Sequence, residues 1–282
     1  MSRTAADPTA RRNRVLERLV ERSNRQGARA LYREPRLYEQ LYRARKQDVR
    51  YYVELAQRHG GPVLELGVGS GRIAVALAQA GVEVVGVDFT SDMLVRARAH
   101  VARLPDDVRA RITLKRGDMR RLTLGRRFGL VIAPFNAFTH LFTRADLELT
   151  LAGCRHHLRP DGRLAFDVPM PDLRALTQDP ARLYRCRPVR DPASGRRHRY
   201  AEASHYAAVQ QVRTVTIVLH RDDGSVERAI PLAQRQFFPA EIEALLHYNG
   251  FSIERRFGDF EFGPLADDSE IQAIVARLQP RK

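Results

Sequence analysis

A glycine turn between a strand-like segment and a helix-like one constrains this chain more than any other feature. The apolar run at residues 63–66 predicts a buried strand, and the helical spacing of apolar residues over 73–80 predicts the helix that follows. A second apolar run at 82–87 ends at Asp88. The turn itself contains three glycines, Gly67, Gly69 and Gly71. This order of strand, glycine turn, helix, strand and acid predicts a unit that can hold an adenosine-bearing cofactor.

The spacing of the glycines indicates which kind of cofactor the unit can hold. A dinucleotide site uses G-x-G-x-x-G to place a pyrophosphate on the helix N-terminus. Here residue 72 is an arginine, and Glu65 stands two residues before the first glycine. Glycines let the backbone approach a ligand because they carry no Cβ atom. A carboxylate about twenty residues further on, here Asp88, can accept both ribose hydroxyls.

The run E-x-G-x-G-x-G from Glu65 to Gly71 resembles motif I of the class I S-adenosylmethionine-dependent methyltransferases. Later segments match in the same order, at residues 117–119, 128–136 and 158–168. Within that family, the chain is similar to the glycine/sarcosine and sugar N-methyltransferases. The resemblance implies a Rossmann-like, doubly wound α/β fold with the strand order 3-2-1-4-5-7-6 and an antiparallel last strand. It also implies S-adenosyl-L-methionine as the cofactor.

The resemblance implies which residues contact the cofactor. Most of them lie near the ends of the predicted strands, and one lies in the N-terminal helical segment. The glycines would follow the methionine and ribose portions, Asp88 the ribose diol, and Asp118 with Met119 the adenine. The full predicted set is Tyr38, Glu65, Gly67, Gly69, Gly71, Asp88, Phe89, Met93, Asp118, Met119 and Pro134. Several members, such as Phe89 and Met93, could equally be core residues.

Four regions are predicted along the chain. Residues 1–36 form a basic extension that contains a short amphipathic helix, and residues 37–168 form the cofactor-binding core with a helical lid at its start. Residues 169–238 form a substrate-side insert, in which alternating apolar residues predict an antiparallel β-hairpin. Residues 239–282 supply a helix and the last two strands of the core.

The acceptor is expected at the end of the fourth strand, because ligands gather at the carboxyl ends of parallel strands. Asn136 can orient a polar group of the acceptor, and His140 is a candidate general base because it titrates near neutrality. The predicted substrate contacts are Tyr42, Phe138 and Arg235. A neutral amine needs no strong base, so the lack of an obvious triad is compatible with methyl transfer.

Composition limits the remaining possibilities. The net charge is +15, which is compatible with a solvated basic face or with an anionic partner. Two cysteines suggest neither a disulfide framework nor a metal site, and no apolar run is long enough to span a membrane, so a cytoplasmic location is expected. The predicted function is methyl transfer to an amine or hydroxyl of a small molecule, in secondary metabolism. The alternatives are RNA or protein methylation, or a non-enzymatic cofactor-binding role, and the chain can be a homo-oligomer.

Overall fold

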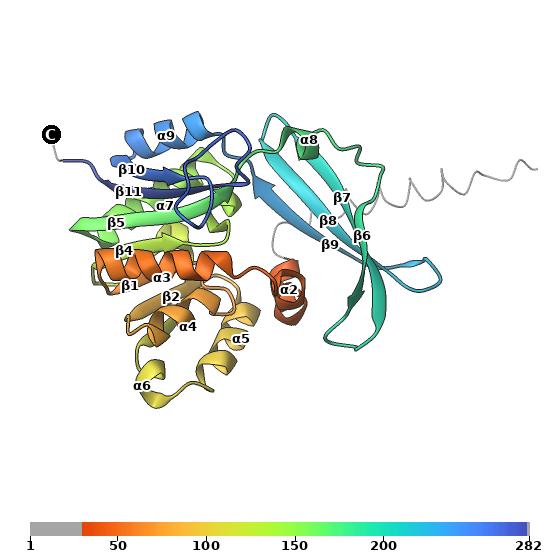
Figure 1. The fold of residues 1–282 in the computed structure, drawn as a ribbon, viewed down its shortest axis with the longest axis horizontal. Helices are drawn as coiled ribbons and strands as arrows, with labels where there is room; N and C mark the ends of the chain where they lie inside the picture. The colour runs from red at the N-terminus through yellow and green to blue at the C-terminus, as the bar shows by residue number, and fades with distance from the viewer. Residues whose placement is uncertain (1–29, 281–282) are drawn as a thin grey trace, which may run out of the picture. The chain divides into compact units, whose positions relative to one another are not determined.

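The computed structural model describes residues 30–280, which divide into two compact units. The first unit contains residues 30–41 and Asp172–Arg235. The second contains Tyr42–Pro171 and the chain from Gln236 onward. Each unit has its own β-sheet (Figure 1). The basic helix predicted within residues 11–29 lies outside the described residues.

The second unit is built on a seven-stranded sheet with the order β10-β11-β5-β4-β1-β2-β3. Its strands are β1 (Val63–Leu66), β2 (Val84–Asp88), β3 (Ile112–Arg116), β4 (Phe128–Ala133), β5 (Leu158–Pro169), β10 (Phe251–Phe257) and β11 (Ile271–Leu278). The first five pair in parallel, whereas β11 is antiparallel to both β5 and β10. This is the predicted doubly wound fold with the predicted strand order, which is therefore confirmed.

Helices cover both faces of this sheet (Figure 1). They are α3 (Gln47–His59), α4 (Arg72–Gln79), α5 (Ser91–Val101), α6 (Asp106–Arg109), α7 (Arg144–His157) and α9 (Pro239–Tyr248), with short 3-10 turns η2 (Met119–Arg121) and η3 (Ala137–His140). Because successive strand residues point to opposite faces, each central strand supplies two separate cores. Leu64 and Val131 pack with α7 and α9 in one core, whereas Val63 and Leu130 pack with α3 and α4 in the other.

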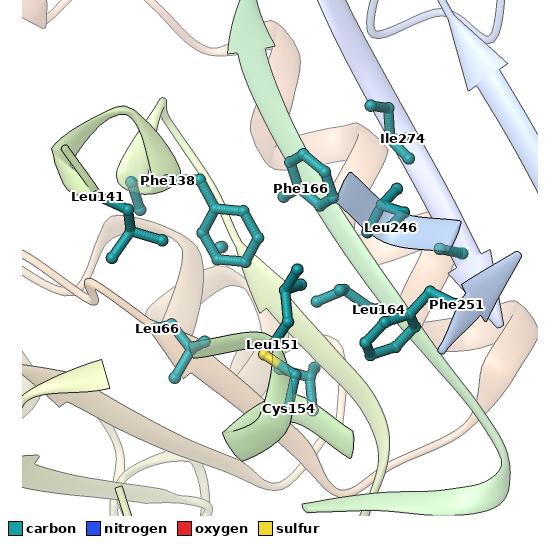
Figure 2. Close-up of a cluster of buried hydrophobic side chains, with 14 of the residues drawn as sticks. Leu66, Phe138, Leu141, Leu151, Cys154, Leu164, Phe166, Leu246, Phe251 and Ile274 are labelled. Atoms are coloured by element: carbon teal, nitrogen blue, oxygen red, sulfur yellow. The ribbon is translucent and has the colours of Figure 1, made fainter. Parts of the chain in front are cut away.

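The core beside α7 and α9 contains a cluster of large side chains (Figure 2). The rings of Phe138 and Phe166 lie 4.6 Å apart between centroids and are tilted by 31°. A small apolar cavity of about 20 Å³ is lined by these two rings and by neighbouring residues such as Leu151 and Leu246. Helix α7 begins at a capping box, in which Thr143 and Asp146 satisfy each other's backbone N–H groups.

The first unit contains a four-stranded antiparallel sheet with the order β6-β7-β8-β9. Its strands are β6 (Tyr184–Arg190), β7 (Arg197–Ala207), β8 (Val212–His220) and β9 (Val226–Arg235). The hairpin predicted from alternation is the β8–β9 pair and is confirmed. The β6–β7 pair was not predicted, because arginines interrupt the apolar alternation in β6 and at the start of β7.

Three short helices complete the first unit or lead out of it. These are η1 (Leu31–Arg33), α2 (Pro35–Tyr42) and α8 (Leu173–Leu176). The helical segment predicted at the start of residues 37–168 consists of two separate helices, α2 and α3, because residues 43–46 are not helical. Strand β5 begins at Leu158, and the Pro-Asp-Gly sequence at 160–162 falls at an irregularity within it.

Candidate active site

The glycine turn connects β1 to α4, and its backbone conformation requires glycine. Gly67, Gly69 and Gly71 have φ angles of +74°, +55° and +88°, in the left-handed region that side chains disfavour. The amides of Gly67 and Val68 both donate to the carbonyl of Val87, at 2.8 and 3.0 Å. A Cβ atom on Gly67 would lie only 3.1 Å from the Cβ of Ala137. The turn therefore lies close to the segment that follows β4.

Asp88 ends β2 and fixes the glycine turn from the next strand. One carboxylate oxygen accepts the amide of Gly69 at 2.8 Å, and the other accepts the amide of Thr90 at 2.7 Å. Burial raises the pKa of Asp88, although these two hydrogen bonds oppose the rise. Each oxygen retains a second lone pair, so the carboxylate can still accept hydroxyl donors. The adjacent Phe89 is 43% exposed, which leaves an aromatic face next to the acid.

Glu65 is a buried acid directly before the glycine turn. It is 2% exposed, and among residues 30–280 its Oε2 atom has no hydrogen-bond partner. Burial raises the pKa of Glu65 well above its usual range, while the positive charge of Arg72 acts in the opposite direction. A buried acceptor without a donor is costly, and such atoms occur where a ligand or water completes the site.

Asp118 follows β3 and is held firmly in place. Its carboxylate accepts the backbone amide of Arg120 at 3.0 Å and the same residue's guanidinium at 2.6 Å. That guanidinium also bonds to Asp146 at 2.8 Å, so it ties this turn to α7. Met119 packs against the core beside it. Because β1, β2 and β3 are parallel neighbours, their carboxyl ends lie at the same end of the sheet. Glu65, Asp88 and Asp118 therefore all lie near that end.

The turn after β4 has an unusual backbone. Phe135 and Asn136 have φ angles of +55° and +65°, and a bulky aromatic residue is a genuine outlier in this region. The buried carboxylate of Asp167, on β5, accepts the amide of Phe135 at 2.7 Å and that of Asn136 at 3.2 Å. The hydroxyl of Tyr52 donates to the same carboxylate at 2.7 Å. In the described part of the chain, the buried Oδ1 atom of Asn136 has no hydrogen-bond partner.

Two arginines and a tyrosine surround the ring of Phe135. The guanidinium of Arg45 lies 4.6 Å from the ring centroid, and one of its nitrogens is 3.9 Å from Asp167. The guanidinium of Arg72 lies 5.4 Å from the same centroid and makes two 2.6 Å bonds to the buried Asp48. Tyr42 packs edge-on against the ring at 5.2 Å. The predicted residue Tyr42 is thus adjacent to this turn.

Other predicted site residues have different surroundings. Phe138 is 3% exposed and Met93 1% exposed, so both are core residues in this structure, and Pro134 is buried as well. His140 ends η3 and is half-buried. Tyr38 and Arg235 belong to the first unit, and their assignment as ligand contacts stays a prediction.

Several charged residues of this site were not predicted from the sequence. They are Arg45, Asp48, Arg72 and Asp167. Only Asp167 gave a visible signal, because it is an acid inside the apolar run 164–168 of a central strand. Such a residue must be paired or functional, since isolated charges are rarely buried.

Comparisons with known proteins relate this chain to methyltransferases. A model described as a methyltransferase domain matches residues 63–162. The glycine/sarcosine N-methyltransferase of Aphanothece halophytica is 27% identical over 238 residues, which cover 80% of this chain and 80% of that protein. The glycopeptide N-methyltransferase MtfA in complex with S-adenosyl-L-methionine is 27% identical over 83% of this chain and 94% of its own, with a TM-score of 0.58. The chain contains a methyltransferase domain, and its relatives and structural neighbours include S-adenosylmethionine-dependent methyltransferases.

This methyltransferase also resembles an enzyme that acts on an amino sugar. The dTDP-3-amino-3,6-dideoxy-alpha-D-glucopyranose N,N-dimethyltransferase of Streptomyces fradiae is 33% identical over 135 residues. The match covers 45% of this chain and 49% of that enzyme, so it spans about half the length of this relative. The predicted resemblance to methyltransferases, and among them to the glycine/sarcosine and sugar N-methyltransferases, is therefore confirmed.

The methyltransferase uses S-adenosylmethionine as its cofactor, and its residues fit that molecule. A Cβ atom on Gly69 would find its nearest neighbour only at 4.0 Å, so this glycine leaves room that a side chain would fill. Asp88 can accept hydroxyls, and Glu65 provides a buried acceptor without a partner among the described residues. When bound, the cofactor supplies a methyl group on a positively charged sulfur, which makes that methyl electrophilic.

Two further properties of the described residues bear on the site. Between residues 30 and 280, no three His, Cys, Asp or Glu side chains group closely enough to hold a metal ion. Within the same range, every helix falls short of the length and hydrophobicity needed to cross a bilayer.

Proposed function

We propose that this methyltransferase transfers the methyl group to an amine nitrogen of a small molecule. The observation that carries this proposal is the unpartnered acceptor Oδ1 of Asn136 at the carboxyl end of β4. An amine that still has an N–H can donate to this oxygen, and an amide oxygen suits it because a neutral amine needs no strong base, whereas a hydroxyl benefits from one. The names of the three relatives described above, which all denote N-methylation, support the same choice.

The residues of the second unit would bind the cofactor from three strand ends. We assign the glycine turn to the methionine and ribose portions, where a Cβ atom would obstruct a close approach. Asp88 would accept hydrogen bonds from the ribose hydroxyls, and Phe89 would lie beside the adenine ring. Asp118 and Met119 would contact the adenine edge. Glu65 would organise the turn or reach the methionine ammonium through a water molecule.

The chain contributes position rather than strong acid–base chemistry. Methyl transfer is an in-line displacement, in which the bond from nitrogen to carbon forms as the bond from carbon to sulfur breaks. The protein must hold the nucleophile in line with that bond at about 3 Å and exclude water. Asn136 would orient the amine through its N–H. The proton released by the amine would pass to water or to His140.

Binding and turnover experiments test this proposal in sequence. Calorimetry should show micromolar binding of S-adenosylmethionine and S-adenosylhomocysteine and no binding of NAD. Turnover would then be followed as release of S-adenosylhomocysteine with glycine, sarcosine, dTDP-linked amino sugars and N-terminal peptide amines. Each amine would be paired with its hydroxyl analogue. Methylation of the hydroxyl analogues in preference to the amines would refute the choice of nitrogen.

A further inference from the structure

The turn after β4 combines backbone strain with a buried carboxylate. Two consecutive non-glycine residues, Phe135 and Asn136, adopt positive φ angles of 55° and 65°. Such conformations persist only where the surroundings hold them, and they cluster at functional sites. Here the surroundings are specific, because the Asp167 carboxylate accepts both amides of the strained pair, at 2.7 and 3.2 Å.

Asp167 has two further partners besides the amides of the turn. The hydroxyl of Tyr52 on α3 donates to one oxygen at 2.7 Å, and a guanidinium nitrogen of Arg45 lies 3.9 Å from the other. The carboxylate is fully buried, so ionising it there is unfavourable. A core strand position would be filled more cheaply by an apolar residue, as at Ala165 and Phe166 in the same strand. The carboxylate therefore requires an explanation beyond packing.

The orientation of Asn136 supplies that explanation. Its side-chain oxygen is buried and lacks a hydrogen-bond partner among the described residues, and its main chain is fixed by Asp167. The neighbouring Ala137 faces the glycine turn, since a Cβ on Gly67 would lie 3.1 Å from that of Ala137. The strained pair thus adjoins the turn that binds the cofactor.

We propose that Asp167 is a positioning residue for methyl transfer. It holds the Phe135–Asn136 turn so that the side-chain oxygen of Asn136, Oδ1, faces the place where the transferred methyl meets its acceptor. This inference rests on the proposed function, because it takes the end of β4 as the acceptor side. It adds a residue that touches neither cofactor nor acceptor and acts through the backbone of the turn.

The test uses two cofactor analogues and needs no acceptor. Sinefungin carries an amino group where S-adenosylmethionine carries the transferable methyl, whereas S-adenosylhomocysteine has nothing there. If Asn136 Oδ1 faces this position, it accepts a hydrogen bond from sinefungin alone. A charge-assisted hydrogen bond corresponds to roughly tenfold or more in affinity. The wild-type protein should therefore bind sinefungin about tenfold more tightly than S-adenosylhomocysteine by calorimetry.

The variants separate positioning from general damage. Asn136→Ala should abolish the preference for sinefungin and leave the affinity for S-adenosylhomocysteine within about threefold. Asp167→Asn has the same shape but loses an acceptor oxygen and the charge, and it should reduce the preference at least fivefold. Asp167→Glu, which retains the charge but moves it by one methylene, should also reduce it. Circular dichroism would confirm that at least one Asp167 variant is folded.

A control is Asp191→Asn, which removes a buried carboxylate of the first unit. The bonds described for Asp191 go to Ala193, Ser194 and Arg228 of the same unit, so this variant should retain the preference. Loss of the preference in Asp191→Asn would assign the effect to buried negative charge in general and overturn the proposal. So would a wild-type protein without a preference, or a folded Asp167 variant that keeps it. Failure to bind either analogue would instead contradict the assigned cofactor site.

Discussion

The amide of Gly69 donates a hydrogen bond to the carboxylate of Asp88 across 2.8 Å, so the glycine turn and the acid of the next strand form one rigid element. The acid thus has two tasks in our proposal, since it shapes the turn and accepts the ribose hydroxyls. Loss of Asp88 should therefore weaken cofactor binding more than loss of a residue that only contacts the ligand.

Asp88→Ala should weaken S-adenosylmethionine binding by about 10- to 100-fold, because hydrogen bonds to charged groups contribute roughly 1.5–3 kcal/mol each. Calorimetry measures the affinity directly. Asp92→Ala is the matched control, since Asp92 is an exposed acid in the first turn of α5. Equal affinity of the Asp88 variant and the wild type would show that the ribose assignment is wrong.

Gly67→Ala and Gly81→Ala should differ in cofactor binding although both introduce a side chain at positive φ. The strain of a left-handed alanine costs roughly 1–2 kcal/mol of stability in either variant. Only the Gly67 variant meets a neighbour, at 3.1 Å, whereas nothing lies within 4 Å at Gly81. Thermal unfolding together with calorimetry should therefore show two destabilised proteins, of which only Gly67→Ala has lost affinity. A similar loss of affinity in Gly81→Ala would refute the local explanation.

Two phenylalanines should respond in opposite ways to truncation. Phe138→Ala removes a ring that is 3% exposed and should lower the free energy of unfolding by about 3–5 kcal/mol. Phe89→Ala removes a ring that is 43% exposed, so its effect on unfolding should be under about 1 kcal/mol, while S-adenosylmethionine binding weakens. Urea denaturation and calorimetry provide the two measurements. A stable Phe138→Ala protein would contradict the core assignment of that ring.

The buried Glu65 should make the ligand-free protein less stable as the pH rises. Its pKa is raised well above the usual 4.5 by burial, so above that pH the unfolded chain has lost a proton that the folded chain retains. The free energy of unfolding then falls with pH, by up to about 1.4 kcal/mol per pH unit for each such group, until the folded carboxyl ionises.

The matched variant is Glu65→Gln, which cannot ionise. Urea denaturation between pH 5 and 7 should show a flatter pH dependence than in the wild type. Some dependence should persist, because burial also raises the pKa of Asp167. Identical slopes in the two proteins would mean that Glu65 in the folded protein is already ionised throughout this pH range, which would contradict the raised pKa.

The sequence predicted the sheet well because its signals are local. Apolar runs mark β1, β2 and β4, and the glycines at 67–71 mark the turn between the first of these strands and α4. The order of the strands came from the family resemblance and not from the runs. The Arg-rich pair β6–β7 was missed, since a polar strand in an antiparallel sheet has little apolar periodicity to detect.

The turn after β4 could not be predicted from its residues. Neither phenylalanine nor asparagine normally signals two successive left-handed residues, and a distant acid accepts the amides of both. Asp167 lies 31 positions beyond Asn136, so the interaction depends on the pairing of β4 with β5. Sequence therefore indicated Asn136 as a candidate, while the residue that fixes it emerged only from the structure.

The two outer strands of the seven-stranded sheet have a consequence for association between molecules. An uncovered strand edge offers unpaired backbone groups on which another chain can build, and charged side chains discourage this. Here β3 ends in Lys115 and Arg116, and β10 carries Glu254, Arg255 and Arg256 in succession. Both margins are thereby protected against edge-to-edge aggregation. Contacts between copies of this enzyme are thus disfavoured along these margins, and growth of a continuous intermolecular sheet is discouraged.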